Sequence, residues 1–172
     1  MKNTLFLIIT ASLFIFSCKK DPASNTQKEN GSLNYNQSYS AWLSYKNNVH
    51  NSYVYTTAYG SFTGNVLEEK VTVTNGTVVA FDYTLKRMDN AIINQYHEDK
   101  ASLGTHDNAV LLLTLDDVYT KAKNVWLKAD PKSNSIYFET KNNGLISNCG
   151  YVPNNCADDC FTGITITSIT AQ

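Results

Sequence analysis

The chain has 172 residues, of which 42% are hydrophobic and 17% are charged. This length suits one domain with a buried core, and the 11 tyrosines and 7 phenylalanines exclude a disordered polyelectrolyte. The 14 basic and 15 acidic side chains leave a net charge of -1. Nucleic acid is therefore not an expected partner, because nucleic-acid-binding proteins carry a marked basic excess.

The first residues have the features of a bacterial lipoprotein signal peptide. Lys2 precedes an apolar stretch over 5–16, which is shorter than the roughly 20 residues of a transmembrane helix but suits a secretory signal. Ile15-Phe16-Ser17-Cys18 then resembles a lipobox. We predict that 1–17 is cleaved and that Cys18 carries acyl chains such as palmitate, anchoring the protein to the outer membrane or another periplasm-facing membrane of a bacterial envelope. A conventional signal that happens to end near a cysteine is the alternative.

The sequence predicts a flexible tether over 18–34 and a single folded domain over 35–172. The tether is polar, and random-coil scaling gives it a reach of about 20 to 25 Å. The folded domain would then work close to the membrane surface without touching it.

The first half of the domain predicts a helix followed by strands. Tyr39 and Trp42 belong to a helical apolar period over 36–48, and 53–59 is rich in β-branched and aromatic residues. Asn75-Gly76 lies between two alternating runs, which predicts a hairpin with a type I′ turn. In the polar stretch that follows, we expect only a short strand over 91–96.

The second half predicts another helix and more strands. Thr114-Leu-Asp-Asp117 is typical of a capping box, and an apolar stripe runs from there to Trp126 before Asp130-Pro131 ends the helix. Strands are expected over 134–141 and 145–152.

The last strand, over 161–170, has an interrupted pattern. Ile164 and Ile166 have the same parity but Ile169 does not, which predicts either a β-bulge near Ser168 or an end of the pairing there. Together these elements predict an α+β fold, with a twisted antiparallel sheet of five to six strands and two helices packed on one face.

In addition to Cys18, the chain has three cysteines that form a local cluster, namely Cys149, Cys156 and Cys160. Export to an oxidising compartment favours one structural disulfide, with the third thiol free or paired with another chain. A bridge from Cys149 to either of the others would contribute about 2 to 3 kcal/mol in the chain-entropy model. A bridge from Cys156 to Cys160 would close a loop of only a few residues. The spacing does not choose among the three pairings.

Candidate metal ligands lie in two polar regions. His97 and His106 are accompanied by acidic residues, and Asp158 and Asp159 could offer oxygens to calcium. Solvated loops explain the same residues. The sequence has no G-x-S-x-G, P-loop or H-E-x-x-H motif, so we expect no cofactor and name no catalytic residue. The tyrosines at 53, 55 and 59 indicate a packed sheet face rather than an aromatic binding platform.

Several of these motifs resemble an uncharacterised family of small bacterial domains, many of them exported. They are Trp42-x2-Tyr45, Tyr53-x-Tyr55, Val71-x-Val73-x-Asn75-Gly76, Thr114-Leu-Asp-Asp-x-Tyr119 and Ala157-Asp-Asp159 before a terminal strand. The resemblance covers most of 36–170 and implies a fold, but no reaction and no functional residue. The cysteine cluster departs from the family pattern.

We therefore expect a lipid-anchored, noncatalytic binding or interaction module, with a membrane as one partner and a protein or small-molecule ligand as the other. One alternative is an envelope enzyme or metal-dependent protein that uses the 97–107 stretch or the 149–160 cysteine loop. Another is an inhibitor-like module, which rests on fold analogy alone.

Overall fold

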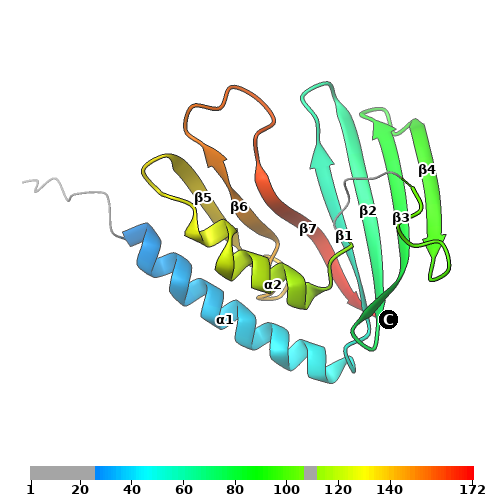
Figure 1. Cartoon of the computed structure of the whole chain (residues 1–172), viewed down its shortest axis with the longest axis horizontal. Helices are drawn as coiled ribbons and strands as arrows, with labels where there is room; N and C mark the ends of the chain where they lie inside the picture. The colour runs from blue at the N-terminus through cyan, green and yellow to red at the C-terminus, as the bar shows by residue number, and fades with distance from the viewer. Residues whose placement is uncertain (1–25, 107–111) are drawn as a thin grey trace, which may run out of the picture.

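The computed structural model describes residues 26–106 and 112–172, with side-chain environments from Asn34 onward. The predicted signal peptide and Cys18 lie outside these residues. Two helices and a large sheet make up the described part of the chain (Figure 1).

All strands belong to one antiparallel sheet with the order β4-β3-β2-β1-β7-β6-β5. Its members are β1 (Tyr53–Gly60), β2 (Asn65–Thr74), β3 (Thr77–Arg87), β4 (Ile92–Asp99), β5 (Asn134–Glu139), β6 (Asn148–Pro153) and β7 (Thr162–Ala171). The α+β class is thus confirmed, but the expected five to six strands are wrong, because the sheet has seven. The weakest sequence signal belongs to β4, a largely exposed edge strand that needs no continuous apolar run.

The helices are α1 (Thr26–Asn48) and α2 (Leu115–Asn124), with a 3-10 turn η1 (Trp126–Lys128) after α2. Both lie on the same side of the sheet, over the half that runs from β5 to β1, and leave β3 and β4 beyond them (Figure 1). The first helix begins at Thr26 rather than at the expected Asn36, so 26–34 is helical where we expected a tether. A hydrophobic period cannot reveal such an extension, because its sequence is polar.

The predicted hairpin turn and the predicted capping box are both confirmed. Asn75 and Gly76 have φ values of 51° and 77° in the β2–β3 hairpin, as a type I′ turn requires. At the start of α2, Asp117 N donates to Thr114 Oγ1 at 3.2 Å and Thr114 N donates to Asp117 Oδ2 at 3.0 Å, completing the capping box.

Of the two alternatives for the last strand, the bulge is the one that the structure contains, because pairing with β1 continues to Ala171. Thr56 pairs with Ser168 while Thr57 pairs with Ile166, so Thr167 is the extra residue. β7 pairs with β6 through residues 162–165 and with β1 from Ile166 to Ala171, on both sides of the bulge. As a result β1 and β7 diverge towards the end of the sheet where β1 finishes (Figure 1).

The core lies between the helices and the sheet and is built around Trp42. Its ring stacks on Tyr119 of α2 at 6.1 Å and meets Tyr53 of β1 edge-on at 5.2 Å. Its Nε1 donates to Asp116 at 2.9 Å. The hydroxyl groups of the buried tyrosines Tyr53 and Tyr55 bond to the backbone just before α2 and at its start, so these two rings form a packed face, as predicted. The prediction is wrong for Tyr59, which is 41% exposed near the end of β1.

Candidate functional site

The predicted histidine site does not assemble, because β4 sends its side chains to opposite faces. His97 lies on the face away from the helices, where its Nδ1 is 2.7 Å from Asp82 Oδ1. Lys70 Nζ lies 2.9 Å from the other oxygen of Asp82. Partial burial acts to raise the pKa of Asp82, but the hydrogen bonds from Lys70 and His97 outweigh it and leave this pKa below its ordinary value.

Glu98, the next residue, turns towards the helix side and is almost completely buried, with 1% of its surface exposed. It accepts hydrogen bonds from the backbone N of His106 at 2.9 Å and of Gly104 at 2.7 Å. These bonds lower the pKa of Glu98 to about 2. The His106 Nδ1 also lies 2.8 Å from Glu98 Oε1. Glu98 therefore fastens the turn that follows β4.

The His106 ring completes an aromatic stack on the helix side of the sheet. It lies 4.0 Å from the ring of Tyr96, which in turn stacks on Tyr83 at 4.6 Å. This packing makes His106 a structural part of the folded turn rather than a metal ligand whose other ligands are missing.

The remaining predicted ligands, Asp158 and Asp159, lie between β6 and β7 and contact neither histidine. Across 34–106 and 112–172, no three His, Cys, Asp or Glu side chains are placed to hold a metal ion together. The predicted metal residues are therefore distributed over separate sites.

The structure forms the cysteine pairing that encloses the shortest loop. Cys156 and Cys160 are joined by a disulfide with a Cα–Cα distance of 6.2 Å, whereas Cys149 is a free thiol buried in the core. Burial raises the pKa of Cys149 to about 12. This thiol stays protonated at neutral pH, and so it is a poor nucleophile.

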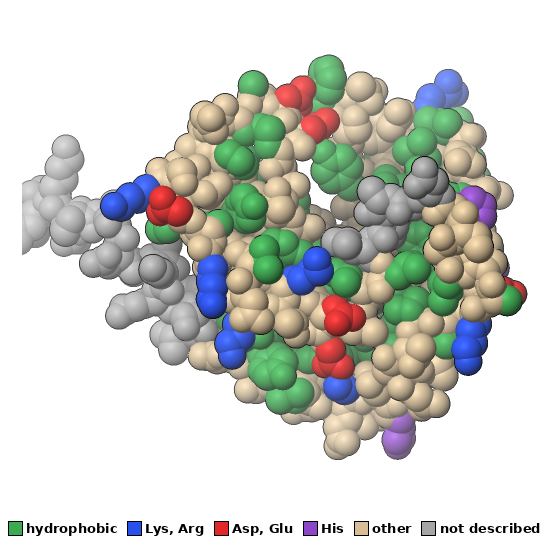
Figure 2. Space-filling view, in the orientation of Figure 1, with side chains coloured by type: hydrophobic (Ala, Val, Ile, Leu, Met, Phe, Trp, Pro, Cys, Tyr) green, Lys and Arg blue, Asp and Glu red, His purple; other side chains and the backbone are tan. Residues whose placement is uncertain are grey.

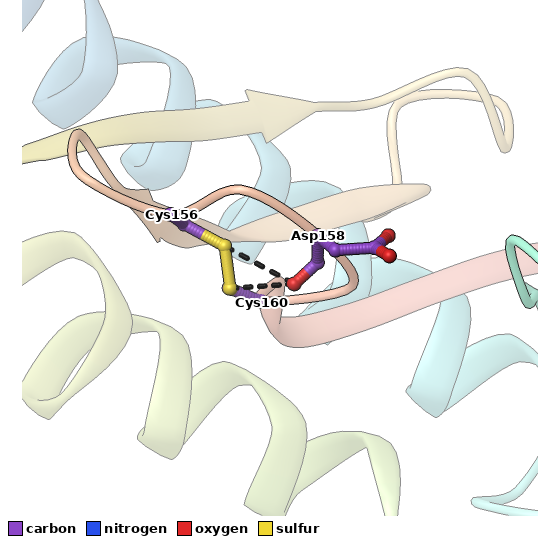
Figure 3. Close-up of a disulfide and its surroundings, with 3 residues drawn as sticks. All are labelled: Cys156, Asp158 and Cys160. Carbon is purple, nitrogen blue, oxygen red and sulfur yellow. Dashed lines mark hydrogen bonds between the residues drawn. A yellow bond between two sulfur atoms is a disulfide. The ribbon is translucent and has the colours of Figure 1, made fainter.

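The disulfide organises the β6–β7 loop around the backbone of Asp158. The Asp158 carbonyl oxygen lies 3.2 Å from the sulfur of Cys156 and 2.7 Å from that of Cys160 (Figure 3). Because disulfide sulfurs carry no hydrogen, these are close sulfur–oxygen contacts rather than hydrogen bonds. The Asp158 carboxylate points away from the bridge.

An aromatic ring fixes the end of this loop to the sheet. Gly150 and Gly163 are register partners on β6 and β7, and a Cβ at either position would lie within 2.5 to 2.7 Å of the Phe161 Cζ. The Phe161 ring therefore rests directly on the two glycines, with Tyr137 edge-on at 6.4 Å. The sequence does not predict this contact, since glycines within two strands are its only signal.

The β6–β7 loop lies at the same end of the sheet as two other turns. We call the segments 61–64, 88–91 and 154–161 together the loop edge. Asp159 Oδ2 accepts a hydrogen bond from the backbone N of Phe62 at 3.3 Å. A Cβ on Gly64 would lie 3.4 Å from the Met88 sulfur. These two contacts connect the three segments into one surface.

The loop edge exposes large apolar side chains among acidic ones. Phe62 is 75% exposed and Met88 is 80% exposed. Figure 2 shows acidic side chains among hydrophobic ones along the upper edge of the molecule. Desolvation, followed by the charges of Asp159 and Asp158, raises the pKa of the nearby Tyr59. The sequence does not predict this surface, because single apolar residues in polar turns leave no periodic pattern.

The fold and the loop edge define a small α+β domain that presents connected loops at one end of a sheet. No known protein family matches the chain, and no curated protein or solved structure matches it either. Over the part of the chain that the structure describes, none of the helices combines the length and apolar character needed to cross a membrane.

Proposed function

We propose that this protein is a noncatalytic binding module of the bacterial cell envelope, anchored by lipid at Cys18. The loop edge is the observation that carries the binding part of this proposal. Phe62 and Met88 are both largely exposed there, on neighbouring turns of a rigid sheet. Large apolar side chains exposed on adjacent turns are candidates for an interaction surface.

The construction of the loop edge supports binding because its conformation is already fixed. The disulfide closes 156–160, the Phe161 ring holds the end of the loop on β7, and Asp159 bonds to the 61–64 turn. A preorganised surface loses less conformational entropy when a ligand binds. Loops on a rigid scaffold are also the usual place for binding residues.

The anchor rests on the sequence of the first 18 residues. It is tested by replacing Cys18 with Ala and fractionating the cells that express the protein. We expect the wild type in the membrane fraction and the variant released from it. Equal membrane association of both proteins would disprove the anchor, and the binding proposal would remain.

The binding role is tested by photo-crosslinking in living cells. A benzophenone amino acid replaces Met88 in one variant and Val125 in a control variant, since Val125 is 53% exposed at the end of α2, away from the loop edge. We expect a discrete adduct of higher mass from position 88 alone. No adduct at position 88, or the same adduct from both positions, would contradict a binding role of the loop edge.

A further inference from the structure

One carboxylate of the loop edge differs from the others that the structure describes. From Asn34 onward, with 107–111 left out, every carboxylate side chain except that of Asp158 has a hydrogen-bond or ion-pair partner. The ion-paired ones are Asp82, Asp89, Asp116, Glu68 and Glu139, and Glu69, Glu98, Asp99, Asp117, Asp130 and Asp159 accept hydrogen bonds from hydroxyl or backbone groups.

The backbone conformation of the β6–β7 loop directs the Asp158 carboxylate away from the rest of the protein. Its carbonyl oxygen faces the two disulfide sulfurs, so its side chain projects outward (Figure 3). The next residue, Asp159, has a φ of 40°, in a left-handed region that non-glycine residues rarely occupy.

The charged groups around Phe62 and Met88 also leave an excess of negative charge. Arg87 precedes the 88–91 turn, but its guanidinium already bonds to Asp89 at 3.1 Å. No basic side chain among the described residues lies within ion-pair distance of Asp158 or Asp159. The surface that carries Phe62 and Met88 is therefore acidic at its rim.

We propose that the loop edge binds a protein segment that presents a lysine or arginine beside an apolar side chain. The cation would pair with the Asp158 carboxylate, and the apolar side chain would pack on Phe62 and Met88. Charge complementarity of this kind selects a basic partner and disfavours an acidic one. This inference rests on the proposed binding function and specifies the chemistry of the ligand.

A membrane surface fits the loop edge less well. Apolar side chains that enter lipid are commonly flanked by basic residues that contact anionic headgroups, whereas the neighbours here are acidic. The exposed carboxylate of Asp158 would have to approach a negatively charged surface. We therefore assign the apolar side chains to a protein partner.

The test uses random heptapeptides displayed on phage, selected against the full chain carrying Cys18→Ser so that no acyl group takes part. We expect the enriched peptides to combine a lysine or arginine with an apolar residue. Asp158→Asn should weaken their binding about five-fold, the effect of one exposed ion pair worth about 1 kcal/mol, and Phe62→Ser should weaken it further. Glu139→Gln is the matched control, since that exposed carboxylate lies at the end of β5 opposite the loop edge, and it should leave binding unchanged.

Three results would overturn the inference. They are enrichment of peptides without basic residues, no enrichment at all, and binding that Asp158→Asn leaves unchanged. Sedimentation of the same protein with phosphatidylcholine vesicles, lost in Phe62→Ser, would assign the surface to lipid instead. If crosslinking at position 88 succeeds while the peptide selection fails, the binding function stands and only the basic partner is rejected.

Discussion

The hydroxyl group of Tyr119 is a sharp test of how the helices are attached to the sheet. It lies 2.8 Å from Ser38 Oγ on α1, donates to the Ser38 carbonyl at 3.1 Å and accepts from the backbone N of Ile146 at 3.2 Å. Ser38 and Ile146 are both buried. One oxygen atom thus connects α2 to α1 and to the segment before β6.

Tyr119→Phe removes this oxygen and keeps the ring that stacks on Trp42. The buried amide of Ile146 and the hydroxyl of Ser38 then lose their partner. An unsatisfied buried polar group costs about 1 to 3 kcal/mol, so we expect the free energy of unfolding to fall by about 3 kcal/mol.

Urea unfolding followed by circular dichroism measures this change, with the denaturant slope expected to stay constant. Tyr39→Phe is the control, because its ring is 38% exposed beside Tyr119 and its hydroxyl has no partner among the described residues. A Tyr119→Phe variant within about 0.5 kcal/mol of the wild type would show that the hydroxyl network does not hold the helices.

Three further predictions concern stability and pH. Thr114→Ala should lower the free energy of unfolding by about 1 kcal/mol in urea titrations, because α2 loses its N-cap; no change would show that the capping box is redundant. Gly163→Ala should lower the melting temperature far more than Gly60→Ala, since its methyl group would meet the backbone of β6 while Gly60 faces open space; equal shifts would contradict the packing of Phe161. The pKa of Glu98 is about 2 in the fold and higher when unfolded, so its stabilisation is complete above the unfolded pKa and disappears as pH falls towards 2. Glu98→Gln should flatten acid unfolding curves in this range, and curves that match the wild type would refute the assignment.

Local chain chemistry predicted the parts of the fold that depend on neighbouring residues. Asn75-Gly76 specifies its turn because both positions need positive φ, and Thr114 with Asp117 specifies a helix start because their side chains bond to nearby amides. The parity change between Ile166 and Ile169 located the bulge, since a period of two residues cannot absorb an extra residue. In each case the determining contacts lie within a few positions of the chain.

The candidate site could not be predicted in the same way, because tertiary contacts create it. Phe62, Met88 and Asp158 lie far apart in the sequence and meet only when three loops reach one end of the sheet. The cysteine pairing depended on Cys149 pointing into the core, which spacing does not reveal. The separation of the two histidines also depends on tertiary contacts, since His97 bonds to Asp82 on one face of the sheet while His106 bonds to Glu98 on the other.

Because β7 changes its partner strand along its length, the order in which the sheet can form is restricted. Strands β1 to β4 follow one another as neighbours, and β5 and β6 form a local hairpin, so each group can pair over short chain distances. The two groups are joined only by β7, which follows both in the sequence and pairs with each through a different part of its length. Closing this long-range pairing requires a large loss of chain entropy. The sheet therefore cannot become continuous, nor can the loop edge bring its three segments together, until β7 has paired with both groups.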